Sequence, residues 1–166
     1  SNAVDFDDLI LLVLRLFAEC PEALDECRER YRYIMVDEYQ DTNNSQFRLV
    51  HSMAKVHQNF CVVGDDDQSI YGWRGAEVAN LLNLEKHFPT VQVVKLEQNY
   101  RSTNTILEAA NAVIKNNVQR REKKLWSDKG AGEPIMLWEF RDDEEEAQSV
   151  VEEINFNRSI KKIKWS

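Results

Sequence analysis

The sequence has few of the residues that hold secreted, membrane-embedded or metal-binding proteins together. Its 166 residues include only Cys20, Cys27 and Cys61, with no C-x-x-C pair and no histidine at metal-ligand spacing, so neither a disulfide framework nor a zinc site is indicated. No apolar run approaches the roughly 20 residues that span a bilayer, and no signal peptide is visible. We expect a cytoplasmic protein with reduced thiols and no membrane partner.

Positive charge is also in short supply. The formal net charge is −8, which argues against a protein that holds nucleic acid mainly through a basic surface. Contact with nucleic acid would have to be local, through stacking or through a few cations. None of the five glycines begins a G-x-x-x-x-G-K-[ST] loop, so the backbone cradle that commonly holds nucleotide phosphates is not within these residues.

Apolar residues make up 43% of the chain, enough for one ordinary hydrophobic core or two small ones. Residues 1–3 have the sequence of an expression-tag remnant and are set aside. The helix predicted at residues 5–19 has an apolar stripe so broad that it requires burial by further protein. Helical periodicity and capping residues predict helices over residues 5–19, 21–30, 78–87, 103–116 and 142–157, and one that begins at residues 43–45.

Three short apolar runs each end at a polar loop. The runs are residues 33–36, 60–63 and 91–96, and the polar segments after them are named the first loop (residues 37–43), the second loop (64–75) and the third loop (97–102). Such runs, separated by helices, are typical of an α/β fold with a parallel sheet, in which ligands collect beyond the carboxyl ends of the strands. The three loops are therefore predicted to meet along one sheet edge. A further strand is predicted over residues 135–140.

The first loop opens with two adjacent carboxylates. Asp37, at the end of the predicted strand, can hold Mg²⁺ through its waters. Glu38 points the other way off the strand and can orient and deprotonate an attacking water. The ordinary alternative is that this pair simply precedes a helix, where carboxylates are common.

The second loop combines three consecutive aspartates with aromatic residues and glycines. Tyr71 or Trp73 in a glycine-flanked loop can stack on a nucleobase, which is worth roughly 1–3 kcal/mol. Ordinary alternatives remain: the aspartates at 65–67 could be solvated, and the aromatic residues could belong to a core. Arg74 and Arg101 could equally be ion-pair partners of the many carboxylates.

All three loops resemble motifs of the UvrD/Rep/PcrA-type superfamily-one DNA helicases. The resemblance covers long strings in the right order and at the right separations, and residues 6–9 and 124–126 also fit it. The strings are VDEYQDTN at residues 36–43, VGDDDQSIYGWRGA at 63–76 and LEQNYRS at 96–102, which are similar to helicase motifs II, III and IV.

The resemblance implies catalytic roles for the first two loops. Asp37 would bind Mg²⁺, and Glu38 would be the general base toward the hydrolytic water. Gln68 would sense the γ-phosphate and couple it to DNA. Gln40 would lie among the nucleotide-binding residues.

It also implies how nucleotide and DNA are held. Tyr71 and Trp73 would meet single-stranded DNA, with Trp73 as the stacking platform, and Arg74 would tie the second loop to the nucleotide site. Tyr100 would lie against the adenine. Arg101 would reach the γ-phosphate from a second motor domain, as an arginine finger does.

The fold implied by the resemblance is a partial RecA-like (P-loop NTPase type) three-layer sandwich with a parallel sheet. Residues 4–96 would be the C-terminal half of the first RecA-like domain, and residues 97–166 the start of the second. The parent protein would be an ATP-dependent 3′-5′ helicase in DNA repair or replication, which couples ATP hydrolysis to translocation on single-stranded DNA and unwinding of duplex DNA. In that family the phosphate cradle lies upstream, so we expect the chain alone to be inactive and to self-associate through uncovered apolar surfaces.

Three alternatives stay open. The motor could belong to a RecB/AddA-type helicase-nuclease, or the chain could be a non-catalytic single-stranded DNA-binding module. A carboxylate-metal nuclease built on residues 65–67 is disfavoured, because adjacent aspartates alternate in direction along a strand and would not converge on one ion.

Overall fold

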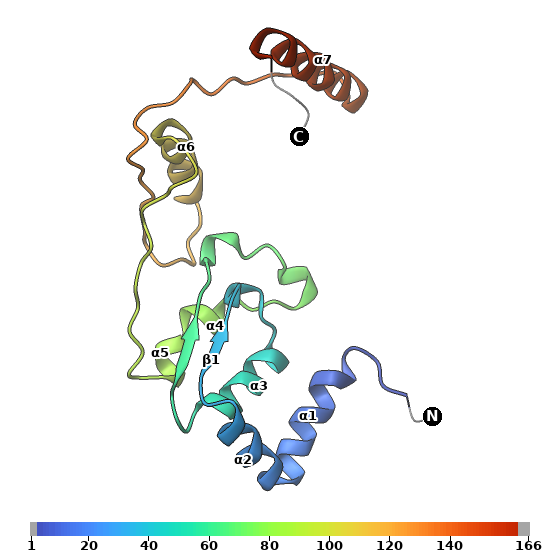
Figure 1. Ribbon diagram of the computed structural model, residues 1–166, viewed down its shortest axis with the longest axis vertical. Helices are drawn as coiled ribbons and strands as arrows, with labels where there is room; N and C mark the ends of the chain where they lie inside the picture. The colour runs from blue at the N-terminus through green and yellow to red at the C-terminus, as the bar shows by residue number, and fades with distance from the viewer. Residues whose placement is uncertain (1–2, 163–166) are drawn as a thin grey trace.

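The computed structural model describes residues 3–162, in which short helices surround a small parallel sheet and two further helices lie beyond it (Figure 1). Two strands pair directly, and three short 3₁₀ turns occupy the first and second loops. The elements are α1 (Asp8–Glu19), α2 (Pro21–Arg30), β1 (Ile34–Val36), η1 (Tyr39–Asp41), α3 (Asn44–Ala54), β2 (Phe60–Val62), η2 (Asp66–Gln68), η3 (Gly72–Arg74), α4 (Ala79–Leu82), α5 (Leu84–His87), α6 (Asn104–Ile114) and α7 (Asp143–Lys161).

The sheet has one covered face. Strands β1 and β2 run parallel with Ile34 opposite Phe60 and Val36 opposite Val62. These four side chains pack against a buried cluster of Tyr39, Ala54, Leu84 and Phe88. Met35, on the opposite face, is 77% exposed. The α/β class is therefore as predicted, whereas the third layer of the predicted sandwich is not found in the described part of the chain.

The predicted strands at 91–96 and 135–140 are wrong for residues 3–162. Both segments are extended but carry no strand pairing, and Val94, Leu96 and Leu137 are largely exposed. A strand is stable only beside a neighbour that satisfies its N–H and C=O groups. Neither segment has such a neighbour, so only the first and second loops meet at the sheet, and the prediction that all three do is wrong.

Helix boundaries differ from the prediction where local side chains compete. The first helix begins at Asp8, because Asp5 and Asp8 each accept a hydrogen bond from the other's backbone N–H, at 2.9 and 3.2 Å, in a turn that precedes the helix. The helix predicted over 78–87 is broken at Asn83, whose φ of −101° and ψ of 16° are not helical, in keeping with the modest helix propensity of asparagine. Helix α7 extends to Lys161, beyond the predicted end at 157.

The segment after the sheet forms a second, smaller unit around α6. Asn104 and Asn111 project from α6, and each exchanges two hydrogen bonds with the backbone of Ser127 and Leu125 respectively, at 2.8 to 3.2 Å. Leu107 on the same helix is 3% exposed. This unit carries the third loop, through a parallel bridge between Gln98 and Trp126. Within residues 3–162, no helix has the length and apolar content to cross a bilayer.

Candidate functional site

The first loop leaves β1 through a strained turn. Asp37 Oδ1 accepts a hydrogen bond from the backbone N–H of Glu38 at 2.9 Å. Glu38 itself has φ 49° and ψ 42°, in the left-handed region that non-glycine residues seldom occupy. Such conformations cost about 1–3 kcal/mol and are found preferentially at functional sites. Both carboxylates remain exposed at the carboxyl end of the strand.

A chain of hydrogen bonds links the first loop to the second. Gln40 Nε2 donates to Glu38 Oε2 at 2.8 Å, and Gln40 Oε1 accepts from the backbone N–H of Asp65 at 3.0 Å. Asp65 Oδ2 in turn accepts from Gln68 Nε2 at 2.8 Å. The structure thus connects three of the predicted site residues, Glu38, Gln40 and Gln68, in one polar path.

The two loops are anchored by their strands and by buried groups beneath them. The N–H of Tyr39 donates to the carbonyl of Val63 at 3.0 Å, which extends the pairing of the sheet into the loops. Tyr39 is 1% exposed, and burial raises the pKa of its hydroxyl to about 12. Asn80 Nδ2 donates to the carbonyl of Thr42 at 3.0 Å. The end of the first loop therefore has little freedom to move.

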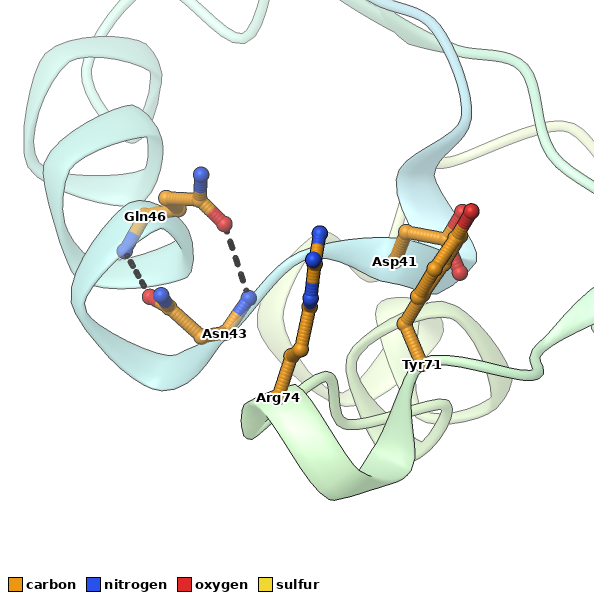
Figure 2. Close-up of a pocket in the computed structure, with 5 residues that line it drawn as sticks. All are labelled: Asp41, Asn43, Gln46, Tyr71 and Arg74. Carbon is orange, nitrogen blue, oxygen red and sulfur yellow. Dashed lines mark hydrogen bonds between the residues drawn. The ribbon is translucent and has the colours of Figure 1, made fainter.

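A pocket of about 280 Å³ lies between the first loop and η3. Figure 2 shows Arg74 standing between Asn43 on one side and Asp41 and Tyr71 on the other. The Arg74 guanidinium lies 4.6 Å from the ring centre of Trp73 and 5.6 Å from that of Tyr71. Trp73 is 75% exposed. The aromatic residues of the second loop are therefore presented to solvent beside a cation, and the interpretation that they belong to a core is wrong.

The three aspartates of the second loop are held by cations from a distant segment. Lys123 Nζ lies 2.7, 2.8 and 2.9 Å from carboxylate oxygens of Asp65, Asp66 and Asp67. Arg120 binds Asp67 through two hydrogen bonds of 2.8 Å. The solvated interpretation is wrong, since Asp66 is 8% exposed. These carboxylates do converge on one cation, contrary to prediction, because residues 66–68 form a 3₁₀ turn in place of a strand. That cation is an ammonium group.

These contacts shift the pKa values of Asp65, Asp67 and Lys123. Burial would raise the pKa of Asp65, but hydrogen bonds from Lys123 and Gln68 outweigh it and hold the pKa below its ordinary value. The hydrogen bond from Arg120 is the main cause that lowers the pKa of Asp67. Burial would lower the pKa of Lys123, yet the three carboxylates raise it. The second loop is thus an ionised network at neutral pH.

Arg120 and Lys123 are site residues that no sequence motif indicates. They lie more than 50 positions from the aspartates, and no short-range pattern joins the two segments. The available signal was complementary charge: an acidic triplet in one loop and a basic run over residues 120–124. Arg121 adds a contact, since its backbone N–H donates to Asp66 Oδ2 at 2.6 Å.

The third loop lies in the unit around α6. Tyr100 is 75% exposed, and its hydroxyl donates to Gln98 Oε1 at 2.9 Å. The backbone N–H of Arg101 donates to Asn99 Oδ1 at 2.9 Å. Its guanidinium makes no hydrogen bond or ion pair with any residue that the structure describes. No contact within residues 3–162 brings Arg101 to Glu38 or Gln68.

The residues at the end of β1 suit a hydrated magnesium ion. Mg²⁺ retains several waters and is commonly bound by one or two carboxylates together with substrate phosphates. Asp37 is exposed, and Oδ1 is its only oxygen that accepts a hydrogen bond from the described residues. Oδ2 is therefore free to accept from a water of the ion. A single carboxylate of this kind fits a nucleotide-bound Mg²⁺.

Comparison with known proteins identifies relatives for both units. The UvrD/REP helicase N-terminal domain family matches residues 1–89, and the UvrD-like helicase C-terminal domain family matches residues 94–165. The chain is 51% identical over 154 residues to the ATP-dependent DNA helicase PcrA of Staphylococcus aureus, which covers 93% of this chain and 21% of that protein. It is 49% identical over 163 residues to PcrA of Staphylococcus epidermidis. This match covers 98% of the present chain and 22% of that relative. The chain thus spans about a fifth of the length of these relatives.

Proposed function

Because the chain belongs to the UvrD/REP helicase family, we propose that it is the region of an ATP-dependent DNA helicase in which ATP hydrolysis is coupled to single-stranded DNA. The observation that carries the proposal is the polar path from Glu38 through Gln40 and Asp65 to Gln68. This path ends in the same loop that presents Tyr71 and Trp73 to solvent. One loop therefore contacts both the candidate hydrolysis site and the candidate stacking surface.

The first loop supplies the hydrolytic groups. Mg²⁺ bound with ATP would neutralise charge on the phosphates. Asp37 would hold waters of that ion through Oδ2, which accepts no hydrogen bond from the described residues. Glu38 orients the attacking water and accepts its proton. Gln68 would contact the γ-phosphate, and its hydrogen bond to Asp65 would couple the presence of that phosphate to the conformation of the second loop.

DNA is held by stacking more than by charge. Trp73 and Tyr71 offer flat faces to successive bases, and Arg74 adds a cation beside them. This arrangement agrees with the net charge of −8, since stacking does not require a broad basic surface. Translocation from 3′ to 5′ and unwinding of duplex DNA in repair or replication are part of the proposal.

The proposal places the boundary between two RecA-like motor domains at residues 96 and 97. The first family match ends at residue 89 and the second begins at residue 94, so the change from one to the other falls within a few residues of this point and supports it. Tyr100 would lie against the adenine, and Arg101 would reach the γ-phosphate when the second domain closes. Its guanidinium, unengaged within the described residues, is available for that role. The phosphate cradle would come from outside these residues, so the chain alone is expected to be inactive.

Replacement of Trp73 in the full-length protein tests the proposal. In Trp73→Ala, single-stranded DNA affinity is expected to fall about 5- to 150-fold, the equivalent of roughly 1–3 kcal/mol of lost stacking. DNA-stimulated ATP turnover should fall with it, while basal turnover is retained. Fluorescence anisotropy with a labelled oligonucleotide and a coupled ATPase assay measure the two quantities.

Trp138→Ala is the matched control, because Trp138 is also partly exposed but packs on Phe140, away from the second loop. It should leave both quantities unchanged. Equal loss of basal and stimulated turnover in Trp73→Ala would indicate a folding defect in place of lost stacking. A wild-type protein without DNA-stimulated ATP turnover would overturn the proposed function itself.

A further inference from the structure

We propose that Gln40 is a positioning residue, which holds the Glu38 carboxylate in its working orientation and ties it to the second loop. The inference rests on the proposed function. It differs from the nucleotide-binding role that the family resemblance implies for Gln40, since it gives this side chain no contact with the nucleotide.

Burial and hydrogen bonding hold both ends of the Gln40 amide in place. The residue is 1% exposed. Its Nε2 donates to Glu38 Oε2 at 2.8 Å, and its Oε1 accepts from the Asp65 backbone at 3.0 Å. Its backbone carbonyl accepts from Ser69 Oγ at 3.4 Å. The second N–H of Nε2 and the second acceptor site of Oε1 are buried with the residue, so a nucleotide could contact this amide only if the side chain left its place between the two loops.

Glu38 depends on this single contact. Gln40 Nε2 is the only hydrogen-bond donor to its carboxylate within residues 3–162. The side chain is otherwise exposed and would sample several rotamers. A general base must stay within hydrogen-bond reach of the water that it activates, and a displacement of about 1 Å can lower a rate about 100-fold. Gln40 therefore supplies the restraint that the base needs.

The backbone is shaped to admit the amide. A Cβ atom at Gly64 would lie 2.7 Å from Gln40 Oε1 and 3.3 Å from the backbone nitrogen of Tyr39. A side chain at position 64 would therefore push the amide away from the loop that it bridges. Glycine at this position lets the two strand ends approach closely enough for Gln40 to span them.

The Gln40 side chain, which bridges Glu38 and Asp65, connects the second loop to the general base. The backbone N–H of Asp65 donates to Gln40 Oε1, and its Oδ2 accepts from Gln68 Nε2. The stacking residues come later in the same loop. A shift of this loop when DNA binds would move the Asp65 N–H and, through Gln40, the Glu38 carboxylate. Loss of the bridge should therefore reduce kcat and the response to DNA together.

The test uses Gln40→Met in the full-length protein, because methionine keeps the volume and removes both hydrogen bonds. We expect kcat for DNA-stimulated ATP turnover to fall about 10- to 100-fold, with KM for ATP within about twofold of wild type. Gln40→Glu keeps a carboxylate oxygen that can accept from the Asp65 N–H. Its other oxygen replaces the Nε2 donor and would face the Glu38 carboxylate without a hydrogen bond, so kcat should stay low. Gly64→Ala, which displaces the amide, should reproduce the kcat defect with Gln40 intact.

Asn80→Ala is the control for loss of a buried amide. Asn80 is 9% exposed and donates to Thr42 in the same loop, but it does not contact Glu38. It should lower the thermal midpoint as Gln40→Met does while kcat stays within about twofold. A large rise in KM for ATP in Gln40→Met would establish a nucleotide contact and overturn the inference, as would unchanged kcat or an equal kcat loss in Asn80→Ala. Wild-type DNA-stimulated turnover in the same assay separates these results from failure of the proposed function.

Discussion

One ammonium group contacts every carboxylate of the aspartate triplet in the second loop. Lys123 Nζ contacts all three carboxylates, and its side chain is only 16% exposed. Removal of one partner of a buried ion pair leaves uncompensated charge and typically costs more than the intact pair contributes. Lys123→Met is therefore expected to lower the free energy of unfolding by about 3 kcal/mol, measured by urea unfolding. Lys124→Met, at an exposed neighbouring position, should change it by less than about 0.5 kcal/mol.

The same network predicts how stability depends on pH. The pKa values of Asp65 and Asp67 lie below the ordinary value of 3.8, so their stabilising contribution is complete above that value and is lost as pH falls through the lower folded-state pKa. The pKa of Lys123 is raised above its ordinary value of 10.5. The charged lysine therefore stabilises the folded protein fully at pH values below 10.5, and this contribution is lost as pH rises through the folded-state pKa. Unfolding midpoints of Lys123→Met should therefore vary less with pH below 4 than those of wild type. Equal acid sensitivity would contradict the network.

At the scale of residues, features contained within a short stretch of sequence could be predicted, whereas contacts between distant stretches could not. The carboxylates after β1 and the exposed aromatic residues of the second loop lie where the sequence placed them relative to their strands. The bridge through Gln40 could not be predicted, because it depends on the left-handed turn at Glu38 and on the space beside Gly64. The contact between Lys123 and the aspartates spans more than 50 residues and arises from tertiary packing.

Residues 92–96 offer a test at the scale of elements. Their apolar pattern predicts a strand, yet their backbone makes no pairing within the described residues. Their amides should therefore exchange with solvent much faster than those of Ile34 and Val63, whose N–H groups donate to the backbone carbonyls of Asn59 and Val36. Hydrogen exchange of the purified chain measures this directly. Protection across residues 92–96 equal to that of β1 would show a strand pairing there.

Helices that carry their own capping residues were predictable, whereas a strand prediction was correct only where the structure supplies a neighbouring strand, as it does for β1 and β2. Helix α3 begins with a reciprocal capping box between Asn43 and Gln46, a device visible in sequence and complete within the element. The runs at 91–96 and 135–140 have apolar and β-branched residues suited to strands, but a strand also requires a neighbour. The pattern of apolar residues within a segment does not show whether a neighbouring strand is present.

At the scale of the whole molecule, the chain exposes far more surface than a compact protein of its size. Its accessible surface is 13360 Å² for 19.4 kDa, whereas a compact monomer of that mass is expected to expose about 8,500 Å². Helix α1 contributes strongly, since Leu9, Leu11, Leu12 and Leu16 are each about half exposed. Large exposed apolar patches mark surfaces that bind other protein. In the proposed helicase, further parts of the motor would cover them.

The exposed stripe predicts that the purified chain self-associates. Sedimentation velocity should show an associated fraction that grows with concentration, because burial of apolar surface between copies gains about 25 cal/mol per Å². The double variant Leu9→Gln/Leu16→Gln changes two leucines seven positions apart, on one side of α1, and should shift the distribution toward monomer. Val118→Gln, at an isolated position that is 94% exposed, serves as the matched control and should not. A monomer at every concentration would show that the stripe on α1 does not drive association of this chain.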